Sequence, residues 1–407
     1  MRGPLRAIRA HPLLNPAALH EGWRERLGGY PADPRHEPHL VAAIEWLVRA
    51  HDATPDGGIS RGFSLTWHPH FGCRGWQPSY PETTGYIIPT LYGAARRLQR
   101  VDLAARAERA ARWEIEIQLR TGAVRGGVVG EPESPAVFNT GQVLLGWLAA
   151  LEETGDAGFA DAARRSARYL VATLDPDGRW RSDSSRFARA DSTLYNTRTA
   201  WALAEAGARL NDAKFTAAAT RGLRAAAELQ APNGWLPQCC LTDPERPLLH
   251  TLAYAIRGFL EGGRVLGDTR LLRTAERAAE ALVATVRADG WMPGRYRSDW
   301  SPAARWSCLT GQAQMANNWM RLAAITGEVK WLEPVPAVLC FLKRTQNRRS
   351  PEPGLRGGIK GAWPVSGAYG AYEVLNWATK FFADALMRHE AIQATSLGAA
   401  PPVSLLA

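Results

Sequence analysis

The chain has 407 residues, of which 46% are hydrophobic and 22% are charged, an ordinary composition for a globular protein with a large core. It contains no run of about 18 uncharged apolar residues, so we expect no membrane span. The formal net charge is +10, but the arginines are scattered through helical segments without a Lys/Arg block or a recognition motif, and we expect no nucleic-acid partner.

The first 38 residues precede the first regular element, and we expect residues 1–38 to form an N-terminal extension. This segment contains basic residues but no continuous apolar stretch of the kind found in signal peptides, which predicts a cytoplasmic protein. The five cysteines are odd in number and lack a repeated spacing, so they indicate a reducing compartment rather than a disulfide framework.

Six similar segments recur along the rest of the chain. They are small and apolar nearly all round, as expected of helices that are buried on more than one side. Intervals of 54 to 66 residues separate the positions on which they align. The segments cover residues 82–98, 138–156, 195–212, 249–268, 308–328 and 374–390, and the aligned positions are Thr84, Thr140, Thr197, Thr251, Thr310 and Asn376.

Amphipathic stretches alternate with these segments. Their apolar residues recur at intervals of three and four, which is typical of surface helices. They cover residues 39–51, 103–120, 159–173, 214–230, 270–287 and 331–346. The alternation predicts six helical hairpins and an all-α (α/α)6 toroid, with outer and inner helices in turn. We expect residues 39–390 to form this single domain and residues 391–407 to form a flexible C-terminal tail.

The links between outer and inner helices differ in length according to their direction. Inner-to-outer links are tight turns, whereas outer-to-inner links run to about 20–30 residues, and long loops in a compact domain are usually functional. All the long links are expected on one face, above the N-termini of the inner helices. The sequence therefore predicts a functional site at this mouth of the toroid.

Tryptophans are concentrated in the long links, which hold eight of the sixteen. A Gly-Trp step after a turn can staple a loop to the barrel, but rings around one mouth also suit stacking on sugar faces. The tryptophans that we assign to substrate binding are Trp67, Trp76, Trp180, Trp235, Trp291 and Trp363.

Polar side chains at the starts of inner helices complete the predicted substrate site, namely Asn139, Asn196 and Gln312. Arg297 and Lys360 favour an anionic sugar such as a uronate without requiring one. The inner helices also direct the positive ends of their dipoles at the mouth.

The segment "GWQPSYPETTGY" (75–86) places Glu82 at the start of the first inner helix. A first-turn glutamate can simply favour the helix dipole, but the other aligned repeats carry no carboxylate at this position, which favours a catalytic acid. Glycoside hydrolysis needs two carboxyl groups. Asp191, ahead of the third inner helix, is the preferred partner of Glu82, followed by Asp299.

A second set of residues suits different chemistry. A lyase or a C5-epimerase needs a tyrosine or histidine to move the proton beside a uronate, and polar groups to neutralise the charge of its carboxylate. Tyr86, Tyr195, His70 and His250 could move the proton, with Asn139 and Asn196 as the polar groups. The residues alone do not choose between the two sets.

Metal ligation is a weaker alternative. Cys240, Asp243 and His250 could be assembled as zinc ligands, and so could His68, His70 and Cys73. The chain has no CxxC pair and no HExxH motif, so we predict neither a metal site nor a cofactor.

Several stretches resemble known families within the broad superfamily of six-hairpin glycosidases and terpenoid-cyclase or prenyltransferase toroids. "CLTGQAQMANNWMRLAAITGE" (308–328) resembles the Gly-Gln-Ala helix of unsaturated glucuronyl hydrolases, which are cytoplasmic (α/α)6 enzymes acting on lyase products. "SYPETTGY" (79–86) is similar to a stretch in the C-terminal domain of glucuronyl C5-epimerases. "YPETTGYIIPTL" (80–91) and "GGIKGAWPVSGAYGAYEVLNWATKFFADAL" (357–386) are similar to uncharacterised bacterial proteins encoded among exopolysaccharide biosynthesis genes.

These resemblances imply a carbohydrate-active enzyme of exopolysaccharide metabolism, similar to glycoside hydrolases, with an oligo- or polysaccharide as its substrate. Three alternatives stay open: a polysaccharide lyase or C5-epimerase, a non-catalytic toroid that binds a glycan or a partner, and a terpenoid-handling toroid. The DxDD and DDxxD motifs of terpenoid enzymes are missing from the sequence. The oligomeric state is not predicted.

Overall fold

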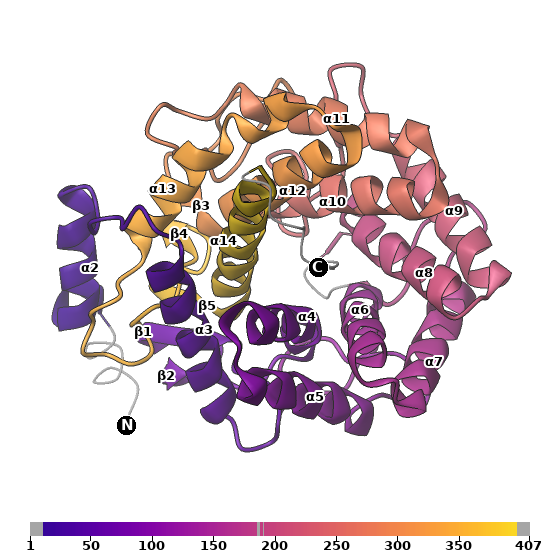
Figure 1. The fold of residues 1–407 in the computed structure, drawn as a ribbon, viewed down its shortest axis with the longest axis horizontal. Helices are drawn as coiled ribbons and strands as arrows, with labels where there is room; N and C mark the ends of the chain where they lie inside the picture. Colours follow the sequence, from indigo (N-terminus) through magenta and orange to yellow (C-terminus); the bar gives the residue numbers. More distant parts are fainter. Residues whose placement is uncertain (1–10, 185–187, 190, 397–407) are drawn as a thin grey trace.

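The computed structural model describes residues 11–184, 188–189 and 191–396, and its helices form two concentric rings (Figure 1). The inner ring consists of α4 (Pro81–Leu98), α6 (Val137–Thr154), α8 (Thr197–Arg209), α10 (Leu249–Leu266), α12 (Leu309–Thr326) and α14 (Asn376–Ser396). The outer ring consists of α3 (Glu37–Asp52), α5 (Val101–Glu116), α7 (Ala157–Thr173), α9 (Ala213–Ala227), α11 (Thr269–Val283) and α13 (Val335–Thr345). This arrangement confirms the predicted (α/α)6 toroid.

The remaining elements lie before the first ring helix or in the links. The helical ones are η1 (Pro12–Leu14), α2 (Pro16–Arg26), η2 (Leu194–Asn196) and η3 (Val329–Leu332). The strands are β1 (Gly62–His68), β2 (Cys73–Trp76), β3 (Ser307–Cys308), β4 (Ala362–Trp363) and β5 (Glu373–Leu375). The antiparallel sheet β2-β1-β5 joins the first link to the last, and α14 packs on α3 and α4, so the two ends of the repeat array close the ring.

Two residues make the tight turn from an inner helix to the next outer helix. Gly155 and Gly267 end α6 and α10 in the left-handed conformation, with φ of 69° and 64°, which glycine adopts without steric cost. Asp156 and Asp268 follow, and each caps the next helix by accepting a hydrogen bond from a backbone N–H two residues ahead. In these two turns, a glycine therefore ends one helix and the aspartate after it starts the next.

In the first two repeats, the repeated threonine holds the incoming link against its inner helix. The hydroxyl of Thr84 accepts a hydrogen bond from the backbone N–H of Ile59 at 3.0 Å. In the next repeat, the hydroxyl of Thr140 accepts one from the N–H of Val124 at 2.9 Å. The bonds satisfy backbone groups that are buried where each link enters the ring.

The last repeat differs from the alignment made on sequence. The N–H of Ile359 donates to the hydroxyl of Thr379 at 2.9 Å, so Thr379 is the counterpart of Thr84 by its bonding. Asn376, the residue aligned with Thr84 on sequence, instead donates to the carbonyl of Ser60 at 2.9 Å. The last inner helix is therefore offset by three residues, close to one helical turn.

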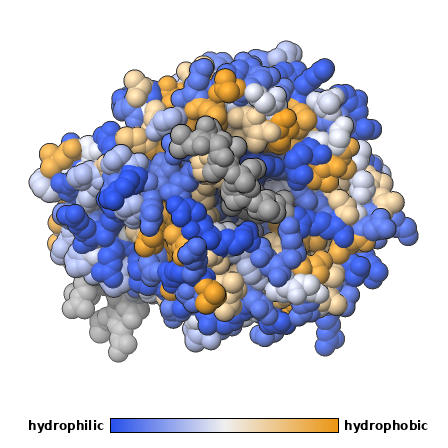
Figure 2. All heavy atoms as spheres, in the orientation of Figure 1, coloured by the Kyte–Doolittle hydropathy of each residue, from blue (hydrophilic) through white to orange (hydrophobic). Residues whose placement is uncertain are grey.

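The predicted tail also differs in part. Helix α14 continues to Ser396, so it includes the first residues of the segment 391–407, and residues 397–407 lie outside the described residues. None of the helices described is long and apolar enough to cross a membrane. The surface in view is mostly hydrophilic, with hydrophobic side chains scattered over it (Figure 2).

A buried ion cluster attaches α2 to the ring. The ammonium of Lys360 forms ion pairs with the carboxylates of Glu21 and Glu25, the latter at 3.0 Å, and the three side chains are at most 4% exposed. Lys360 was expected to bind substrate, but the structure places it inside this cluster. The reason is that the inner face of α2 supplies two carboxylates that pair with Lys360. The sequence of α2 contains no pattern that predicts this pairing.

Replacing Lys360 with methionine is expected to lower the free energy of unfolding by about 3–5 kcal/mol, because two carboxylates stay buried without their cation. Urea denaturation of the full chain measures the loss. The matched control is Lys330→Met, at a half-exposed lysine that pairs with Glu328 at 2.9 Å, where the change should stay below about 1 kcal/mol. Equal losses in the two variants would contradict the structural role of the cluster.

Candidate functional site

A cavity of about 410 Å³ lies at the N-terminal ends of the inner helices, where the long links converge. This volume is within the range of small-molecule sites. The side chains in its wall that matter for chemistry or for stacking are Arg61, Tyr80, Glu82, Tyr86, Glu131, Phe138, Asn139, Tyr195, Cys240, His250, Tyr254, Arg295, Tyr369 and Trp377.

Glu82 is the carboxylate that α4 brings to this cavity. It is the second residue of the helix, and its carboxylate accepts a hydrogen bond from the hydroxyl of Tyr80. Burial raises the pKa of Glu82 to about 7, although the Tyr80 bond and the charges of Arg198 and Arg61 act in the opposite direction. At neutral pH the group can therefore both donate and accept a proton.

The orientation of Glu82 separates the two interpretations of its position. A cap would accept hydrogen bonds from the backbone N–H groups at the start of α4. In the described part of the chain the hydrogen bond of Glu82 runs to Tyr80 instead, and the carboxylate faces the cavity. The geometry therefore supports a chemical role over a capping role.

His250, at the start of α10, lines the same cavity as a neutral ring. Burial lowers its pKa to about 4. Its Nδ1 lies 2.8 Å from the amide oxygen of Gln314, which can only accept, so Nδ1 carries the proton and Nε2 carries a lone pair. His250 is therefore a fixed tautomer that can accept a proton at Nε2.

Aromatic rings surround His250 and form much of the wall. The ring centroids of His250 and Tyr254 are 4.3 Å apart, and those of His250 and Tyr369 are 5.5 Å apart. Phe138 packs against Tyr195 and Tyr254 at 5.4 and 5.0 Å. Burial raises the pKa of Tyr254 well above its ordinary value, so its hydroxyl stays protonated.

Two arginines that the sequence analysis did not select also line the cavity. Arg61 donates to Glu373 at 2.8 Å and lies over the ring of Trp377 at 4.9 Å. Arg295 donates to the carbonyl of Arg246 at 2.6 Å and to the hydroxyl of Thr242 at 3.2 Å, both neutral acceptors. Its positive charge can therefore attract an anionic ligand in the cavity.

Glu131 is a second carboxylate in the wall, also absent from the sequence-based selection. The Nε2 of His70 is 2.7 Å from one oxygen of the Glu131 carboxylate, and the backbone N–H of Val128 donates to the other oxygen at 3.1 Å. His70 itself is exposed and does not line the cavity; its link to the site is its contact with Glu131. The signal that could have identified Glu131 was its place in a Pro- and Gly-rich link.

Asp191, the predicted partner of Glu82, does not line the cavity. It is exposed, and Arg189 lies 3.4 Å from it. Asp299, the second choice, is also exposed and accepts a hydrogen bond from the N–H of Ser301 at 2.9 Å. Of the predicted carboxylates, the structure brings only Glu82 to the cavity wall.

The selected tryptophans lie outside the lining and hold the links in place. Trp180 and Trp235 are buried; the first donates to the carbonyl of Leu170 at 3.0 Å, and the second packs edge-on against Trp300. Among the described residues the cavity is lined instead by Trp377, which the sequence analysis did not select. Trp67, Trp76, Trp291 and Trp363 are half-buried at other places in the links.

Of the polar residues predicted to bind substrate, one lines the cavity and the others do not. Asn139 lines the cavity, with its amide N–H donating to the carbonyl of Arg125 at 3.0 Å. Asn196 is buried outside the lining, and Gln312 donates to the carbonyl of Gly290 at 2.6 Å. Arg297 is exposed and donates to the carbonyl of Pro302.

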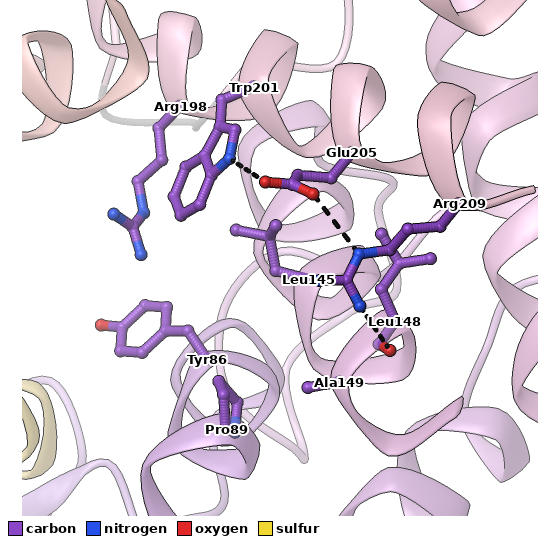
Figure 3. Close-up of a pocket in the computed structure, with 9 residues that line it drawn as sticks. All are labelled: Tyr86, Pro89, Leu145, Leu148, Ala149, Arg198, Trp201, Glu205 and Arg209. Carbon is purple, nitrogen blue, oxygen red and sulfur yellow. Dashed lines mark hydrogen bonds and ion pairs between the residues drawn. The ribbon is translucent and has the colours of Figure 1, made fainter. Parts of the chain in front are cut away.

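The floor of the cavity is made by Tyr86, which also borders a small void of about 20 Å³ farther along the barrel axis (Figure 3). Arg198 lies beneath this floor and is 2% exposed, with its guanidinium 5.9 Å from the Tyr86 ring centroid. Ion pairs of the inner helices fill the axis beyond it, among them Arg257–Glu261 at 3.1 Å and Lys380–Asp384 at 2.6 Å. The described inner helices therefore enclose a charged, packed axis rather than a channel.

Within residues 11–184, 188–189 and 191–396, no group of three or more His, Cys, Asp or Glu side chains is gathered so that it could hold a metal ion. Cys240 and His250 both line the cavity, but His68 and Cys73 lie in the strands β1 and β2 of the first link, and His70 lies in the turn between them.

Comparison with known proteins adds the fold family. No family model matches the sequence, and no curated protein matches it. Solved structures do match: a heparin-specific unsaturated glucuronyl hydrolase with a TM-score of 0.68 at 18% identity, over 88% of this chain and 97% of that one. The unsaturated glucuronyl hydrolase from Bacillus sp. GL1 gives 0.66 at 16% identity, over 87% and 97%. An alpha-amylase from Clostridium perfringens gives 0.62 at 11% identity, over 88% and 98%. The chain shares the toroid fold of these enzymes.

The burial of Glu82 should appear as a pH-dependent loss of stability. Its pKa in the folded chain is about 7, above the ordinary value of 4.5, so the wild-type fold loses stability as the pH rises between these values. We expect Glu82→Gln to gain about 2–3 kcal/mol over wild type at pH 8 relative to pH 5, measured by urea denaturation. The exposed Glu333→Gln serves as the control, and a Glu82→Gln difference that does not change with pH would refute the burial argument.

Proposed function

We propose that this chain is a carbohydrate-processing enzyme, similar to glycoside hydrolases, that acts on a uronate-containing oligosaccharide. The observation that carries the proposal is Glu82: a carboxyl group with a pKa of about 7 in the wall of a cavity at the mouth of the toroid. A general acid is most effective when its pKa is near the working pH.

The surroundings of Glu82 support this substrate class. Arg295 supplies positive charge for a uronate carboxylate, and Trp377 supplies a ring for the apolar face of a sugar. Among the similar structures, one unsaturated glucuronyl hydrolase is described with dGlcA-Glc-Rha-Glc and another with dGlcA-GalNAc6S. The resemblance to proteins encoded among exopolysaccharide genes supports a place in that metabolism.

The proposed acid step uses three groups around the Glu82 carboxyl, namely Tyr80, Arg61 and Arg198. Glu82 gives its proton to the glycosidic oxygen, whose bond to the anomeric carbon breaks, or to the ring double bond where the uronate is unsaturated. The oxygen of a water molecule then adds to the sugar cation that forms, and Glu131 accepts the proton that this water loses. The Tyr80 hydroxyl then donates its hydrogen bond to the carboxylate that remains, and the charges of Arg61 and Arg198 stabilise the anion. Glu131, held by His70, is the second carboxyl group of the wall and would position or activate water.

Glu82→Gln is expected to lower turnover of unsaturated uronyl disaccharides by about 10²–10⁴-fold, because it removes the acid and keeps the shape. The loss of the ultraviolet absorbance of the conjugated uronate measures the rate. In the wild type, kcat/KM should fall as the pH rises above about 7, as Glu82 loses its proton.

Asp191→Asn is the matched control, since this carboxylate is exposed and outside the cavity. It should keep turnover within about threefold of wild type. If Glu82→Gln kept full turnover, the acid assignment would fail. Saturable binding of the disaccharide without turnover by the wild type would favour the non-catalytic toroid.

A second candidate function rests on His250. Its unprotonated Nε2, the Tyr254 hydroxyl and Asn139 share the cavity with Glu82, which is the equipment for removing a proton beside a uronate carboxylate. This arrangement suits a lyase or a C5-epimerase.

The epimerase or lyase alternative predicts exchange at C5. In heavy water, the wild type should place deuterium at C5 of a saturated uronate oligosaccharide or form an unsaturated product, and mass spectrometry detects both. His250→Gln should reduce either outcome at least about 100-fold. Absence of exchange and of elimination in the wild type, together with hydrolysis that depends on Glu82, would dismiss this alternative.

A further inference from the structure

Helix α2 has charged residues on the face that packs on the ring and apolar residues on the face that points away from it. Its inner face buries the carboxylates Glu21 and Glu25, which pair with Lys360. Its outer face carries Leu19 and Trp23, four residues apart and therefore on one side of the helix. A helix that packs on a protein core normally turns its apolar face inward, so the outward stripe is not explained by folding.

The outer stripe is the main exposed apolar area of the described chain. Leu19 is 45% exposed, Trp23 is 55% exposed and Leu27 is 60% exposed, and Leu14, just before the helix, is 60% exposed. These four are the majority of the seven large hydrophobic side chains that are exposed within the described residues. Such clustering marks an interaction surface rather than random exposure. Figure 1 places α2 at the outer edge of the toroid.

Arginines lie directly beside the stripe. A cleft of about 1040 Å³ is bordered by Trp23 and by Arg24, Arg74, Arg348 and Arg349. None of these arginines forms a salt bridge within the part of the chain that the structure describes, and Glu352 is the acidic side chain of the lining. The surface next to the apolar stripe is therefore positive, on a protein whose net charge is +10.

We propose that the outer face of α2 docks on an anionic lipid surface, with Leu19, Trp23 and Leu27 in the interface and the neighbouring arginines on the lipid headgroups. Helices that lie in a membrane interface combine Trp and Leu on one face with basic residues beside them. The leucines distinguish this surface from a sugar platform, because saccharides stack on flat rings rather than on branched aliphatic side chains. The docking is independent of the chemistry at the mouth of the toroid.

Charge complementarity supports the choice of occupant. Anionic headgroups attract each nearby arginine with about a fivefold gain in binding, and the gain is lost when salt screens the surface. A protein partner of ordinary composition would need acidic groups placed opposite four separate arginines. A lipid surface presents such groups everywhere.

Flotation of the full chain with vesicles tests the proposal. Wild type should float with vesicles of phosphatidylcholine and phosphatidylglycerol, and should bind pure phosphatidylcholine at least about tenfold more weakly. The triple variant Leu19→Gln, Trp23→Gln, Leu27→Gln should lose at least about tenfold in binding to the anionic vesicles. Arg348→Gln with Arg349→Gln should lose about fivefold per arginine and show a weaker salt dependence.

The matched control is Val101→Gln with Val329→Gln, two exposed apolar residues (87% and 77%) elsewhere on the ring, which should bind as wild type does. Thermal unfolding of each variant checks that the toroid is intact. The proposal is overturned if wild type does not float with anionic vesicles, or if the triple and control variants bind alike. It is also overturned if the triple variant abolishes only a dimer seen by light scattering, or only retention on an anionic polysaccharide.

Discussion

The toroid depends on how closely neighbouring inner helices approach at their N-terminal ends. A Cβ on Gly85 would lie 2.6 Å from the Cα of Val143, and one on Gly141 would lie 2.8 Å from the Cα of Thr199, distances that real Cβ atoms do not adopt. Glycine at these positions lets backbone meet backbone. The helix starts therefore converge on a narrow mouth, and their dipoles point at one small volume.

The same convergence determines the chemistry of Glu82. A carboxyl group placed among closely packed helix starts is cut off from most of the water, and burial alone would make it a very weak acid. Arg61 at the side, Arg198 beneath and the Tyr80 hydroxyl bring its pKa back to about 7. Burial and these three partners therefore act on the pKa of Glu82 in opposite directions, and removing any of the partners would raise that pKa.

The sequence predicted the rings, because the repeat period and the three-to-four spacing are local signals that tertiary packing does not override. Glu82 and His250 reach the cavity for this reason, whereas Asn196 and Gln312, also at helix starts, turn into the core. The links are different, since their path depends on contacts made far away along the chain. Trp180 donates to a carbonyl of α7, and Lys360 pairs with carboxylates of α2. Arg295 lines the cavity, whereas Arg297, two residues later, is exposed. No local pattern distinguishes these outcomes.

The packed axis has a consequence for the shape of any ligand. Tyr86 and Arg198 stop the cavity from below, and the ion pairs of α10 and α14 occupy the space behind them. Within the described residues the mouth is therefore the opening through which a ligand reaches Glu82 and through which it leaves again. For the oligosaccharide proposed above, this geometry favours a terminal sugar as the one that meets the carboxyl group of Glu82.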